Sequence, residues 1–511
     1  MIDDSMPLEL LTPREMAEAD ALTIADLPGG GYALMRNAGA AIAAVVLERF
    51  PEVSGVDILC GPGNNGGDGY LVARLLCEAG VPVCIWALGV PRAGTDAALA
   101  SQACPIEARS LAEFRPERSR LIVDALLGAG LSKPTTGEAA SALEKAGESG
   151  APVLAVDLPS GVSGESGRIL GSSLPADVTV TFFRKKPGHL LEPGRSFCGE
   201  TIVADIGIGR EVIETIAPLT YENHPDLWLS ELPFPAFDAH KYARGHACVF
   251  SGGPSATGAA RLAALAAARA GAGAVTILSP PAAMQVNAAH LTAIMLRRIE
   301  TVEDLAAFAR ERKPSSYVIG PGFGAGEQAR RFTLALLRGK DTGCKGIVID
   351  ADAITSFRDD PAPLFDAAAL PDAPSVVFTP HAGEFRRLFP DLAEGEAGSR
   401  LEAARAAARR ANAVIVYKGP DTVVAAPDGR ARINANGTPF LATAGSGDVL
   451  GGVIAGLLAQ GMPAFDTASA AVWMHAEAGS QFGPGLIAED LPSLLPAILR
   501  ELFRKAAKPS A

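Results

Sequence analysis

Short apolar runs alternate with helical patterns along nearly the whole chain, and this alternation is the feature that most limits its possible folds. In the first half the predicted strands are Val56–Cys60, Val83–Ala87, Leu121–Asp124, Val153–Asp157, Val178–Phe182 and Thr201–Ala204. Predicted helices cover 13–25, 31–49, 69–79 and 138–149. Strands that alternate with helices form a mostly parallel sheet with both faces covered. We therefore predict an α/β fold with a Rossmann-like three-layer αβα domain in this half.

The second half has the same style. Its predicted strands are Cys248–Ser251, Val275–Leu278, Tyr317–Gly320, Ile347–Asp350, Val376–Thr379 and Val414–Tyr417, and its predicted helices cover 257–270, 302–312, 400–411, 447–459 and 465–480. The stretch 215–240 between the halves contains Pro218, Pro225, Pro233 and Pro235 without clear periodicity, which is typical of a linker. A chain of 511 residues is too long for one ordinary core. We predict two domains, 1–222 and 223–511.

Charge and cysteine usage exclude several classes of protein. The net charge is −12, from 45 basic and 57 acidic residues, which argues against a nucleic-acid partner. The seven cysteines are scattered and form no CxxC, which indicates a reducing compartment and no zinc site. No apolar run reaches the roughly 18–20 residues that a membrane span needs, and the acidic start Met1-Ile2-Asp3-Asp4 lacks the apolar core of a signal peptide. We expect a soluble cytoplasmic protein.

The sequence Gly445-Ser446-Gly447-Asp448 stands at a predicted helix start. Free backbone N–H groups and the positive end of the helix dipole suit a phosphate at this position. A carboxylate would repel that phosphate but is well suited to take a proton from a hydroxyl beside it. The pattern predicts phosphoryl transfer to an alcohol with Asp448 as the base; the alternative is an Asp that only caps the helix.

Other loops of the second half also follow predicted strands. Residues 251–260 join a strand to an Ala-rich helix, but no Lys stands at the Walker position, which argues against a P-loop. His381 lies between a Pro and a Gly after a strand, where loops line a cleft. Lys418-Gly419-Pro420-Asp421-Thr422 supplies a cation, a turn and a hydroxyl, which suit a nucleotide phosphate or simply a surface turn.

In the first half, the loop Gly61–Gly69 follows a strand and formally contains GxGxxG. A dinucleotide fingerprint expects an acid at the end of the next strand, and Val83–Ala87 has none. The two Asn and one Asp of this loop suit a hard cation or a polar ligand instead. Asp124, Asp157 and the sequence Lys186-Pro187-Gly188 follow other strands, so we expect a polar cleft at one edge of the sheet.

The motifs of the first half resemble those of a known enzyme domain. GPGNNGGDGY, DALLGAGL, AVDLPSGV and KPG resemble the NAD(P)H-hydrate epimerase domain over nearly residues 8–210. The resemblance implies that Asp157 contacts the hydrate as an acid/base and that Asn65, Asp124 and Ser160 hold a potassium ion. The substrate site that it implies consists of Asn64, Asn65, Gly66, Gly67, Asp68, Gly128, Ala129, Gly130, Leu131, Ser132, Lys133, Pro134 and Asp157.

The second half resembles the ADP- or ATP-dependent NAD(P)H-hydrate dehydratase, which has a ribokinase-like fold. The blocks GGPSATGAARLAALAAARAGAG, GPGFG, DADAI, TPHAGEF, KGPDT, LATAGSGDVLGG and GLIAEDL occur in the expected order over about 235–500. The resemblance implies that the hydrate is contacted by Ala259, Gly322 or Gly324, His381 and Asp448. It implies a nucleotide site made of Lys418, Gly419, Pro420, Asp421, Thr422, Gly445, Ser446 and Gly447.

Together the two resemblances imply a bifunctional repair enzyme for hydrated NADH and NADPH. Fused forms of this kind usually use ADP, so we expect ADP as co-substrate. We expect Mg²⁺ to accompany the ADP phosphates. We also expect a homo-oligomeric protein. The alternatives are a small-molecule kinase of the ribokinase class, which the GSGD turn alone would permit, and an N-terminal half that only binds a nucleotide ligand.

Overall fold

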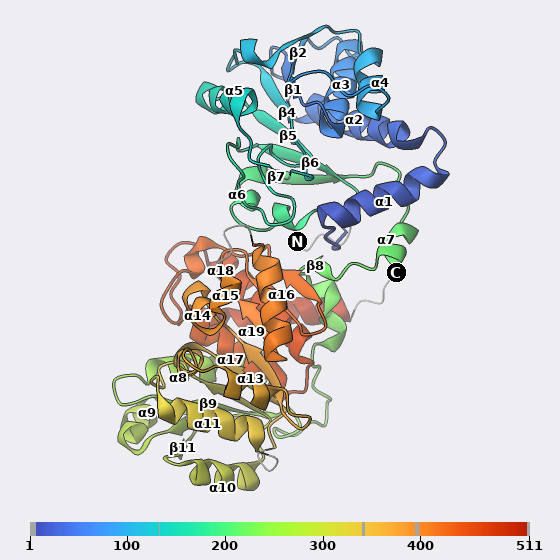
Figure 1. Ribbon diagram of the computed structural model, residues 1–511. Coiled ribbons are helices and arrows are strands. Elements are labelled where there is room, and N and C mark those ends of the chain that lie inside the picture. Colours follow the sequence, from blue (N-terminus) through green and yellow to red (C-terminus); the bar gives the residue numbers. More distant parts are fainter. Residues whose placement is uncertain (1–6, 132, 340–342, 394–397, 508–511) are drawn as a thin grey trace. The chain divides into compact units, whose positions relative to one another are not determined.

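The computed structural model describes residues 7–131, 133–339, 343–393 and 398–507 (Figure 1). The chain divides into two compact units, Met1–Tyr221 and Glu222–Ala511. A short strand, β8 (Thr220–Glu222), lies at the boundary.

Unit 1 contains a fully parallel seven-stranded sheet in the order β3-β2-β1-β4-β5-β6-β7. Its central strands are buried at every residue, as expected for a sheet covered on both faces. The predicted parallel sheet is therefore confirmed, and only the short β3 was not predicted. The strands are β1 (Val56–Cys60), β2 (Val83–Ala87), β3 (Ala108–Ser110), β4 (Leu121–Ala125), β5 (Val153–Val156), β6 (Val178–Phe182) and β7 (Glu200–Ala204).

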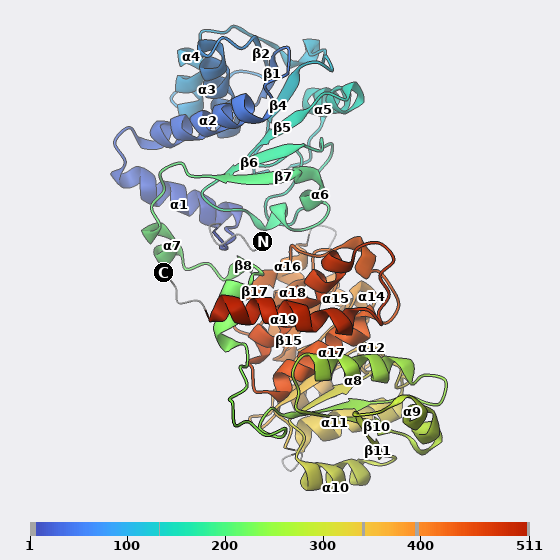
Figure 2. The ribbon, with the colours of Figure 1, turned by 180° about the vertical axis from the view of Figure 1, so that it is seen from behind.

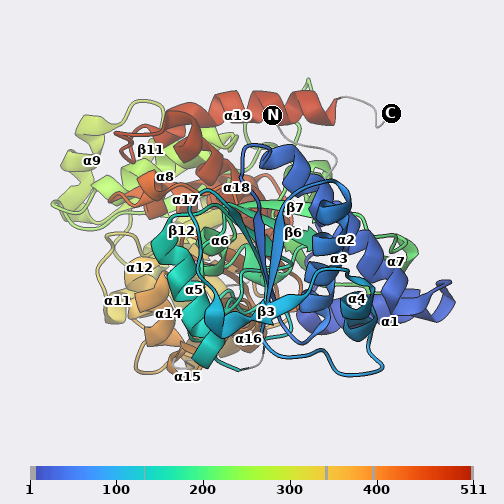
Figure 3. The same ribbon diagram turned by 90° about the horizontal axis from the view of Figure 1, so that it is seen from above.

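Two hydrophobic cores on the two faces make unit 1 a three-layer structure. Ile58 packs in the core under the helices α2 and α3, whereas the next residue, Leu59, packs in a second core with α5. Figure 3 shows α5 on one side of the sheet and α2, α3 and α4 on the other. The helices are α1 (Pro13–Asp26), α2 (Gly30–Arg49), α3 (Asn64–Glu78), α4 (Asp96–Ala103), α5 (Gly137–Ser149), α6 (Gly194–Cys198) and α7 (Glu211–Ile216), with 3₁₀ turns η1 (Leu111–Glu113) and η2 (Pro187–His189).

The start of α3 differs from the prediction and positions the first site. The helix begins at Asn64, not at 69, so the NNGGDG sequence forms its first turns. Tight packing explains why glycines are used here: a Cβ on Gly61 would lie 1.8 Å from the Leu126 carbonyl oxygen, and one on Gly66 1.8 Å from that of Gly61. The polar side chains therefore stand on a rigid helix at the carboxyl edge of the sheet.

Unit 2 has a larger sheet, whose strands follow the order β11-β10-β9-β12-β13-β14-β15-β16-β17. Strands β9 to β15 pair in parallel, which confirms the predicted parallel arrangement, whereas β16 and β17 are antiparallel. Three strands were not predicted from the sequence: β11, which is largely exposed, and β16 and β17, which are only three residues long. The strands are β9 (His246–Phe250), β10 (Ala274–Ser279), β11 (Met295–Arg298), β12 (Ser316–Ile319), β13 (Gly346–Ile349), β14 (Ser375–Phe378), β15 (Val414–Tyr417), β16 (Val423–Ala425) and β17 (Ala431–Ile433).

The helices of unit 2 form two groups that cover this sheet. One group is α8 (Gly258–Arg269), α17 (Ser446–Ala459), α18 (Ala464–Phe482) and α19 (Leu491–Ala506), which contact one another and are visible in Figure 2. The other is α10 (Val302–Arg312), α11 (Glu327–Arg338), α12 (Ala351–Thr355), α13 (Ala362–Ala368), α14 (Ala382–Leu388), α15 (Pro390–Ala393) and α16 (Arg400–Ala411). The short helix α9 (Met284–His290) and the 3₁₀ turns η3 (Pro225–Leu227), η4 (Leu229–Glu231), η5 (Pro281–Ala283) and η6 (Pro439–Leu441) complete the unit.

The interpretation of 215–240 as a linker is wrong for its central part. Trp228 is fully buried, donates a hydrogen bond to Asn223 at 3.3 Å, and packs edge-to-face on Trp473 with ring centroids 6.0 Å apart. Pro225 starts the short 3₁₀ turn η3 here instead of breaking contact with the domain. Residues 222–232 therefore belong to the fold of unit 2, because burying a Trp with its N–H satisfied outweighs the weak local periodicity.

Of the helices that the structure describes, α2 alone is long and apolar enough to cross a membrane by length and composition. Its apolar residues Ile42 and Val46 lie in the core of unit 1. We therefore interpret α2 as a core helix.

Candidate active sites

A cavity of about 840 Å³ opens at the carboxyl edge of the sheet in unit 1. It lies where loops after parallel strands converge, the position at which open α/β sheets bind ligands. Of the predicted substrate residues, the wall contains Asn64, Asn65, Asp68, Gly128, Ala129, Gly130, Leu131, Lys133 and Asp157. Gly66 and Gly67 are buried in α3 behind the wall, Pro134 is exposed outside it, and Ser132 lies outside the described residues.

Asp157 is held in place from several sides. Lys186 donates to its Oδ1 at 2.6 Å, Thr181 donates to the same oxygen at 3.0 Å, and the backbone N–H of Ala129 donates to Oδ2 at 2.9 Å. Its backbone has φ 67°, a left-handed conformation that costs energy for a residue with a Cβ. Burial alone would raise the pKa of Asp157, but Lys186 and these hydrogen bonds lower it to about 2. The carboxylate is therefore ionised at neutral pH.

Asp124 and Ser160 meet behind the cavity. The Ser160 hydroxyl donates to Asp124 at 2.6 Å and the Ser160 backbone N–H donates to it at 2.7 Å. Asp124 is fully buried, which raises its pKa, and the ion pairs found in the described part of the chain do not include it. The Asn65 amide nitrogen is buried without a hydrogen-bond partner there. A buried carboxylate beside a neutral hydroxyl oxygen suits a monovalent cation, whose ligands are oxygen atoms.

In unit 2 the GSGD sequence forms the start of α17, as predicted. Gly445 precedes the helix with φ 91°, which a residue with a side chain rarely adopts. Within the described residues no side chain caps this end, so its N–H groups are available for an anion. Ser446 is buried against His475 at 3.1 Å, and Asp448 lies in the first turn. Burial raises the pKa of Asp448 to about 6, an effect that Asp350 increases and Lys418 opposes.

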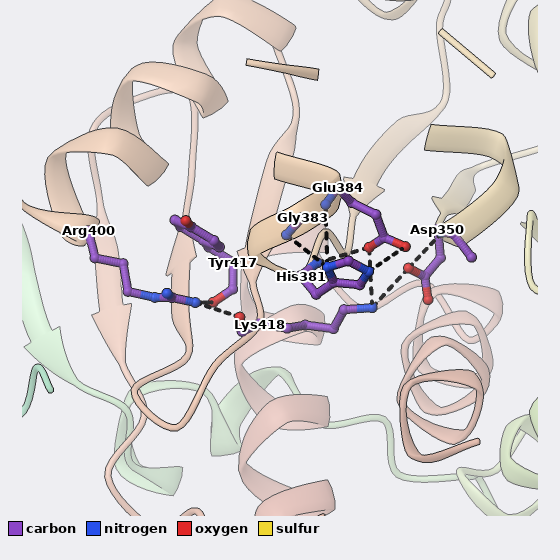
Figure 4. A network of polar contacts seen from close by, with 8 residues as sticks. Asp350, His381, Gly383, Glu384, Arg400, Tyr417 and Lys418 are labelled. Atoms are coloured by element: carbon purple, nitrogen blue, oxygen red, sulfur yellow. Dashed lines mark hydrogen bonds and ion pairs between the residues drawn. The ribbon is translucent and has the colours of Figure 1, made fainter. Parts of the chain in front are cut away.

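Lys418 is the centre of the polar network beside this helix start (Figure 4). Its Nζ lies 2.9 Å from Asp350 Oδ1 and 3.9 Å from Glu384 Oε2. A Cβ placed on Gly447 would lie 3.4 Å from the same nitrogen. Burial lowers the pKa of Lys418, but Asp350 and Glu384 outweigh burial and raise it, so the cation is permanent. The structure thus brings Lys418 together with the GSGD turn, as a phosphate site requires.

His381 caps α14 at the edge of the same network. Its Nδ1 accepts from the backbone N–H of Gly383 at 2.9 Å and of Glu384 at 3.3 Å, while Nε2 lies 3.3 Å from Glu384 Oε1. The side chain is 54% exposed, so its free edge faces solvent and a ligand can reach it. The His381 backbone also bridges to Lys418, which joins the two motifs.

Ala259 and the GPGFG loop form another part of unit 2. A Cβ on Gly322 would lie 3.5 Å from Ala259 Cβ, so these predicted contacts are neighbours. Gly324 is fixed by a hydrogen bond from its N–H to Asp352 at 2.9 Å. The start of α8 and this loop therefore meet at the carboxyl edge of the sheet.

The loop Lys418–Thr422 is held by hydrogen bonds within the loop and by contacts from Arg400. The Thr422 hydroxyl donates to the Gly419 carbonyl at 2.8 Å and accepts from its N–H at 3.1 Å. Arg400, from the first turn of α16, stacks on Tyr417 at 3.7 Å, donates to the carbonyl oxygens of Tyr417 and Lys418, and pairs with Asp421 at 3.3 Å (Figure 4). The loop is thus pre-formed before any ligand arrives.

Two family models match the chain, one in each unit. Residues 31–188 match the YjeF-related protein N-terminus, and residues 247–499 match NAD(P)H-hydrate dehydratase. A bifunctional NAD(P)H-hydrate repair enzyme of Salinibacter ruber is 33% identical over 97% of this chain and 96% of its own length. Its counterpart in Moorella thermoacetica is 34% identical over 96% of this chain and 97% of its own length.

The chain belongs to the bifunctional NAD(P)H-hydrate repair enzyme family.

Solved structures are similar to part of this repair-enzyme family member. A Bacillus subtilis ADP/ATP-dependent NAD(P)H-hydrate dehydratase co-crystallised with ATP and Mg²⁺ is 26% identical, with a TM-score of 0.47 over 55% of this chain and 98% of its own. A yeast protein is 24% identical, with a TM-score of 0.35 over 41% of this chain and 93% of its own.

Sequence reasoning about this repair-enzyme family member gave no role to several residues that contact the motif residues or line a site. Asp350 follows β13 as the N-cap of α12; it was placed at a predicted strand end and in the DADAI block, but without a role of its own, and Arg400 was predicted only as a helix start. Asp20, which lines the cavity of unit 1, lies in a helix without any motif. The available signal was weak in each case, because their positions depend on contacts between segments distant in sequence.

Proposed function

We propose that this chain repairs hydrated NADH and NADPH by two activities on one polypeptide. Residues 1–222 interconvert the R and S hydrates, and residues 223–511 dehydrate the S hydrate to the intact dinucleotide at the expense of ADP. The similarity to bifunctional repair enzymes over nearly the full length supports this assignment. A ribokinase-class kinase would need neither the polar cavity of the first unit nor its Asp157–Lys186 pair.

One observation carries the dehydratase assignment: Lys418 lies beside Gly447 at the open N-terminus of α17, and Asp448 of the same first turn interacts with it electrostatically. The cation and the N–H groups attract the terminal phosphate of ADP, whereas the carboxylate can only accept a proton from the attacking group. With a pKa raised to about 6, Asp448 is ionised at neutral pH and still basic enough to act.

The dehydration follows from this arrangement. Asp448 takes the proton of the C6 hydroxyl, whose oxygen then forms a bond to the terminal phosphorus of ADP while AMP leaves. The helix N-terminus and Lys418 stabilise the charge that develops on the phosphate oxygens. The lone pair of the ring nitrogen expels the phosphate from C6, and loss of a proton from C5 restores the dihydronicotinamide ring.

The remaining residues of unit 2 orient the two ligands. We propose that Ala259, Gly322, Gly324 and His381 contact the hydrate, and that the residues from Lys418 to Thr422 and from Gly445 to Gly447 hold the nucleotide. Mg²⁺ would accompany ADP and neutralise phosphate charge.

The epimerase chemistry needs a positive intermediate. The ring nitrogen of the hydrate can expel the C6 hydroxyl to give a planar iminium ion, to which water returns on either face. We propose that Asp157, kept ionised by Lys186, stabilises that ion and accepts the proton released by the incoming water.

A potassium ion fits behind the epimerase cavity. We propose that Asn65, Asp124 and Ser160 hold it, because the charge of Asp124 is otherwise buried among neutral groups. Its role would be to neutralise that charge and fix the loops after β1, β4 and β5. We further expect a homo-oligomer in the cytoplasm, where the seven free cysteines stay reduced.

The test is direct. Purified protein is incubated with a mixture of R and S hydrates of NADH, with ADP and Mg²⁺, and absorbance at the NADH band is followed. Complete conversion of both epimers is expected. Conversion of the S hydrate only would contradict the epimerase assignment. A kinase would be favoured if neither hydrate is converted but the protein consumes ADP when a sugar or a pyrimidine alcohol is supplied.

A further inference from the structure

One of the carboxylates that line the cavity of unit 1 comes from a helix that carries no motif. Asp20 lies on α1, and the residues of this helix that line the cavity are Pro13, Met16, Ala17, Asp20 and Ile24. Their spacing of three and four residues places them on one helical face. Helix α1 therefore adds Asp20 to a wall that already contains Asp157 and Lys186.

The helix is firmly built at its start, which fixes this face. Thr12 and Glu15 form a capping box, with the Thr12 N–H donating to Glu15 at 2.8 Å and the Glu15 N–H donating to the Thr12 hydroxyl at 3.2 Å. Pro13 stands at the first helical position, where it costs no hydrogen bond. The position of Asp20 is thus set by the helix, not by a mobile loop.

The titratable groups around Asp20 have clearly different environments. Those that line the cavity are Asp20, Asp68, Asp96, Lys133, Asp157 and Lys186, and His189 touches Asp157 from behind. Burial raises the pKa of Asp20 to about 6, with Lys186 lowering it and Asp157 raising it. Burial and the same neighbouring acids raise the pKa of Asp68 well above its usual range. Near neutrality Asp157 is ionised, whereas Asp20, with a pKa of about 6, can gain and lose its proton.

We propose that Asp20 is the general acid of the epimerase site, donating a proton to the hydroxyl that leaves C6 of the hydrate while Asp157 stays ionised. This inference rests on the epimerase activity proposed above and assigns a catalytic residue to it. Two carboxylates whose environments separate their protonation states are the usual arrangement for such a division of roles.

The proposed epimerisation exchanges the C6 hydroxyl for a new one in two stages. The Asp20 carboxyl proton moves to the C6 hydroxyl oxygen, the C6–O bond breaks with its electron pair on that oxygen, and water leaves. The nitrogen lone pair forms the C6=N bond of the iminium ion. Water then forms a new C6–O bond on the other face, the C6=N pair returns to nitrogen, and the released proton passes to Asp157 and on to solvent. Asp20 regains a proton from solvent, so no net proton is gained or lost.

The test uses the full-length protein with Asp20→Asn and Asp20→Glu, and Glu18→Gln as the control. Glu18 is exposed on the same helix and does not line the cavity. Chiral chromatography measures the rate of epimer interconversion from pH 5 to pH 9, and ADP-dependent dehydration of pure S hydrate on the same samples reports that the protein is folded.

We expect Asp20→Asn to reduce the kcat of interconversion by roughly 10²–10⁴-fold, with little change in KM. The wild-type rate should fall as pH rises above about 6, because the acid must be protonated, and this limb should disappear in Asp20→Asn. Asp20→Glu should recover part of the rate, and Glu18→Gln should match the wild type.

Two results would overturn the assignment. If wild-type protein interconverts the epimers and Asp20→Asn does so equally well, Asp20 is not the acid. If Asp20→Asn retains the descending limb while Asp68→Asn loses it, Asp68 holds that role instead. Failure of the wild type itself to interconvert the epimers would contradict the proposed epimerase function and is distinguishable from both.

Discussion

The ammonium group of Lys418 lies 2.9 Å from the carboxylate of Asp350, and this ion pair holds a cation at the open end of α17. The lysine follows β15 directly and the aspartate follows β13 directly, so the pair links the loops after two strands. Asp350 thereby determines where Lys418 can meet a phosphate, and it also raises the pKa of Asp448. The proposed base Asp448 and the proposed phosphate-binding cation Lys418 are thus coupled through one buried carboxylate.

Replacing Asp448 with Asn should abolish dehydration and leave epimerisation unchanged. Removing a general base typically costs roughly 10²–10⁴-fold in rate. In the wild type, kcat/KM for dehydration should rise with pH up to about 6 and then level off, because the base must be ionised. Stopped absorbance assays over pH 5–8 measure this; near-wild-type dehydration by the variant would refute the assignment of the base.

Lys418→Ala should weaken ADP binding more than hydrate binding. A hydrogen bond to a charged group contributes about 1.5–3 kcal/mol, which corresponds to roughly 10–150-fold in affinity. The variant should also lower Tm, because Asp350 loses its ionic partner while only 3% of its side chain is exposed. Titration calorimetry with ADP measures the first effect, with Lys418→Ala/Asp350→Asn as the control for stability. An unchanged ADP affinity would place Lys418 outside the nucleotide site.

Arg400→Lys should raise the KM for ADP severalfold with little effect on the KM for the hydrate. Lysine keeps the charge but cannot stack flat on Tyr417 while donating to two carbonyl oxygens, so the 418–422 loop loses its clamp. Arg409→Lys, at an exposed position of the same helix, is the matched control. Steady-state kinetics with each substrate varied in turn separates the two constants, and equal changes in both would indicate a general structural defect.

A fragment of residues 1–221 should fold alone and interconvert the epimers without nucleotide. Both hydrophobic cores of its sheet and the whole 840 Å³ cavity lie within this unit. The complementary fragment must begin at 222, because Trp228 is buried in unit 2. Circular dichroism and chiral chromatography check the two points; a folded but inactive first fragment would favour the binding-module alternative.

Asp124→Asn should remove most of the potassium dependence of epimerisation. The substitution keeps the shape of the side chain but removes the charge that a cation would neutralise. Potassium titrations of the wild type and the variant measure the effect. The control is Asp177→Asn, because Asp177 lies on the opposite edge of the sheet, before β6. If the wild-type rate is the same in potassium-free buffer, the proposed ion is absent.

The sequence by itself determined the strands that carry the sites, because each is a short apolar run followed by polar or small residues. It also determined that the GSGD turn starts a helix, since glycine is the residue that tolerates φ 91° at this position. The motif residues Asn65, Asp157 and Lys418 were identified for the same local reason: each lies within one or two residues of a predicted strand end or in the loop that follows it.

Only the tertiary structure decided which charged side chains lie next to the site residues. Asp157 is paired with Lys186, which is 29 residues away, and Lys418 with Asp350, which is 68 residues away. Asp20 acquires its pKa of about 6 from burial beside both members of the first pair. Residue spacing does not encode such contacts, because they depend on how strands order themselves in a sheet and on which helix closes over its edge. The same physics placed Trp228 in a core despite the prolines around it.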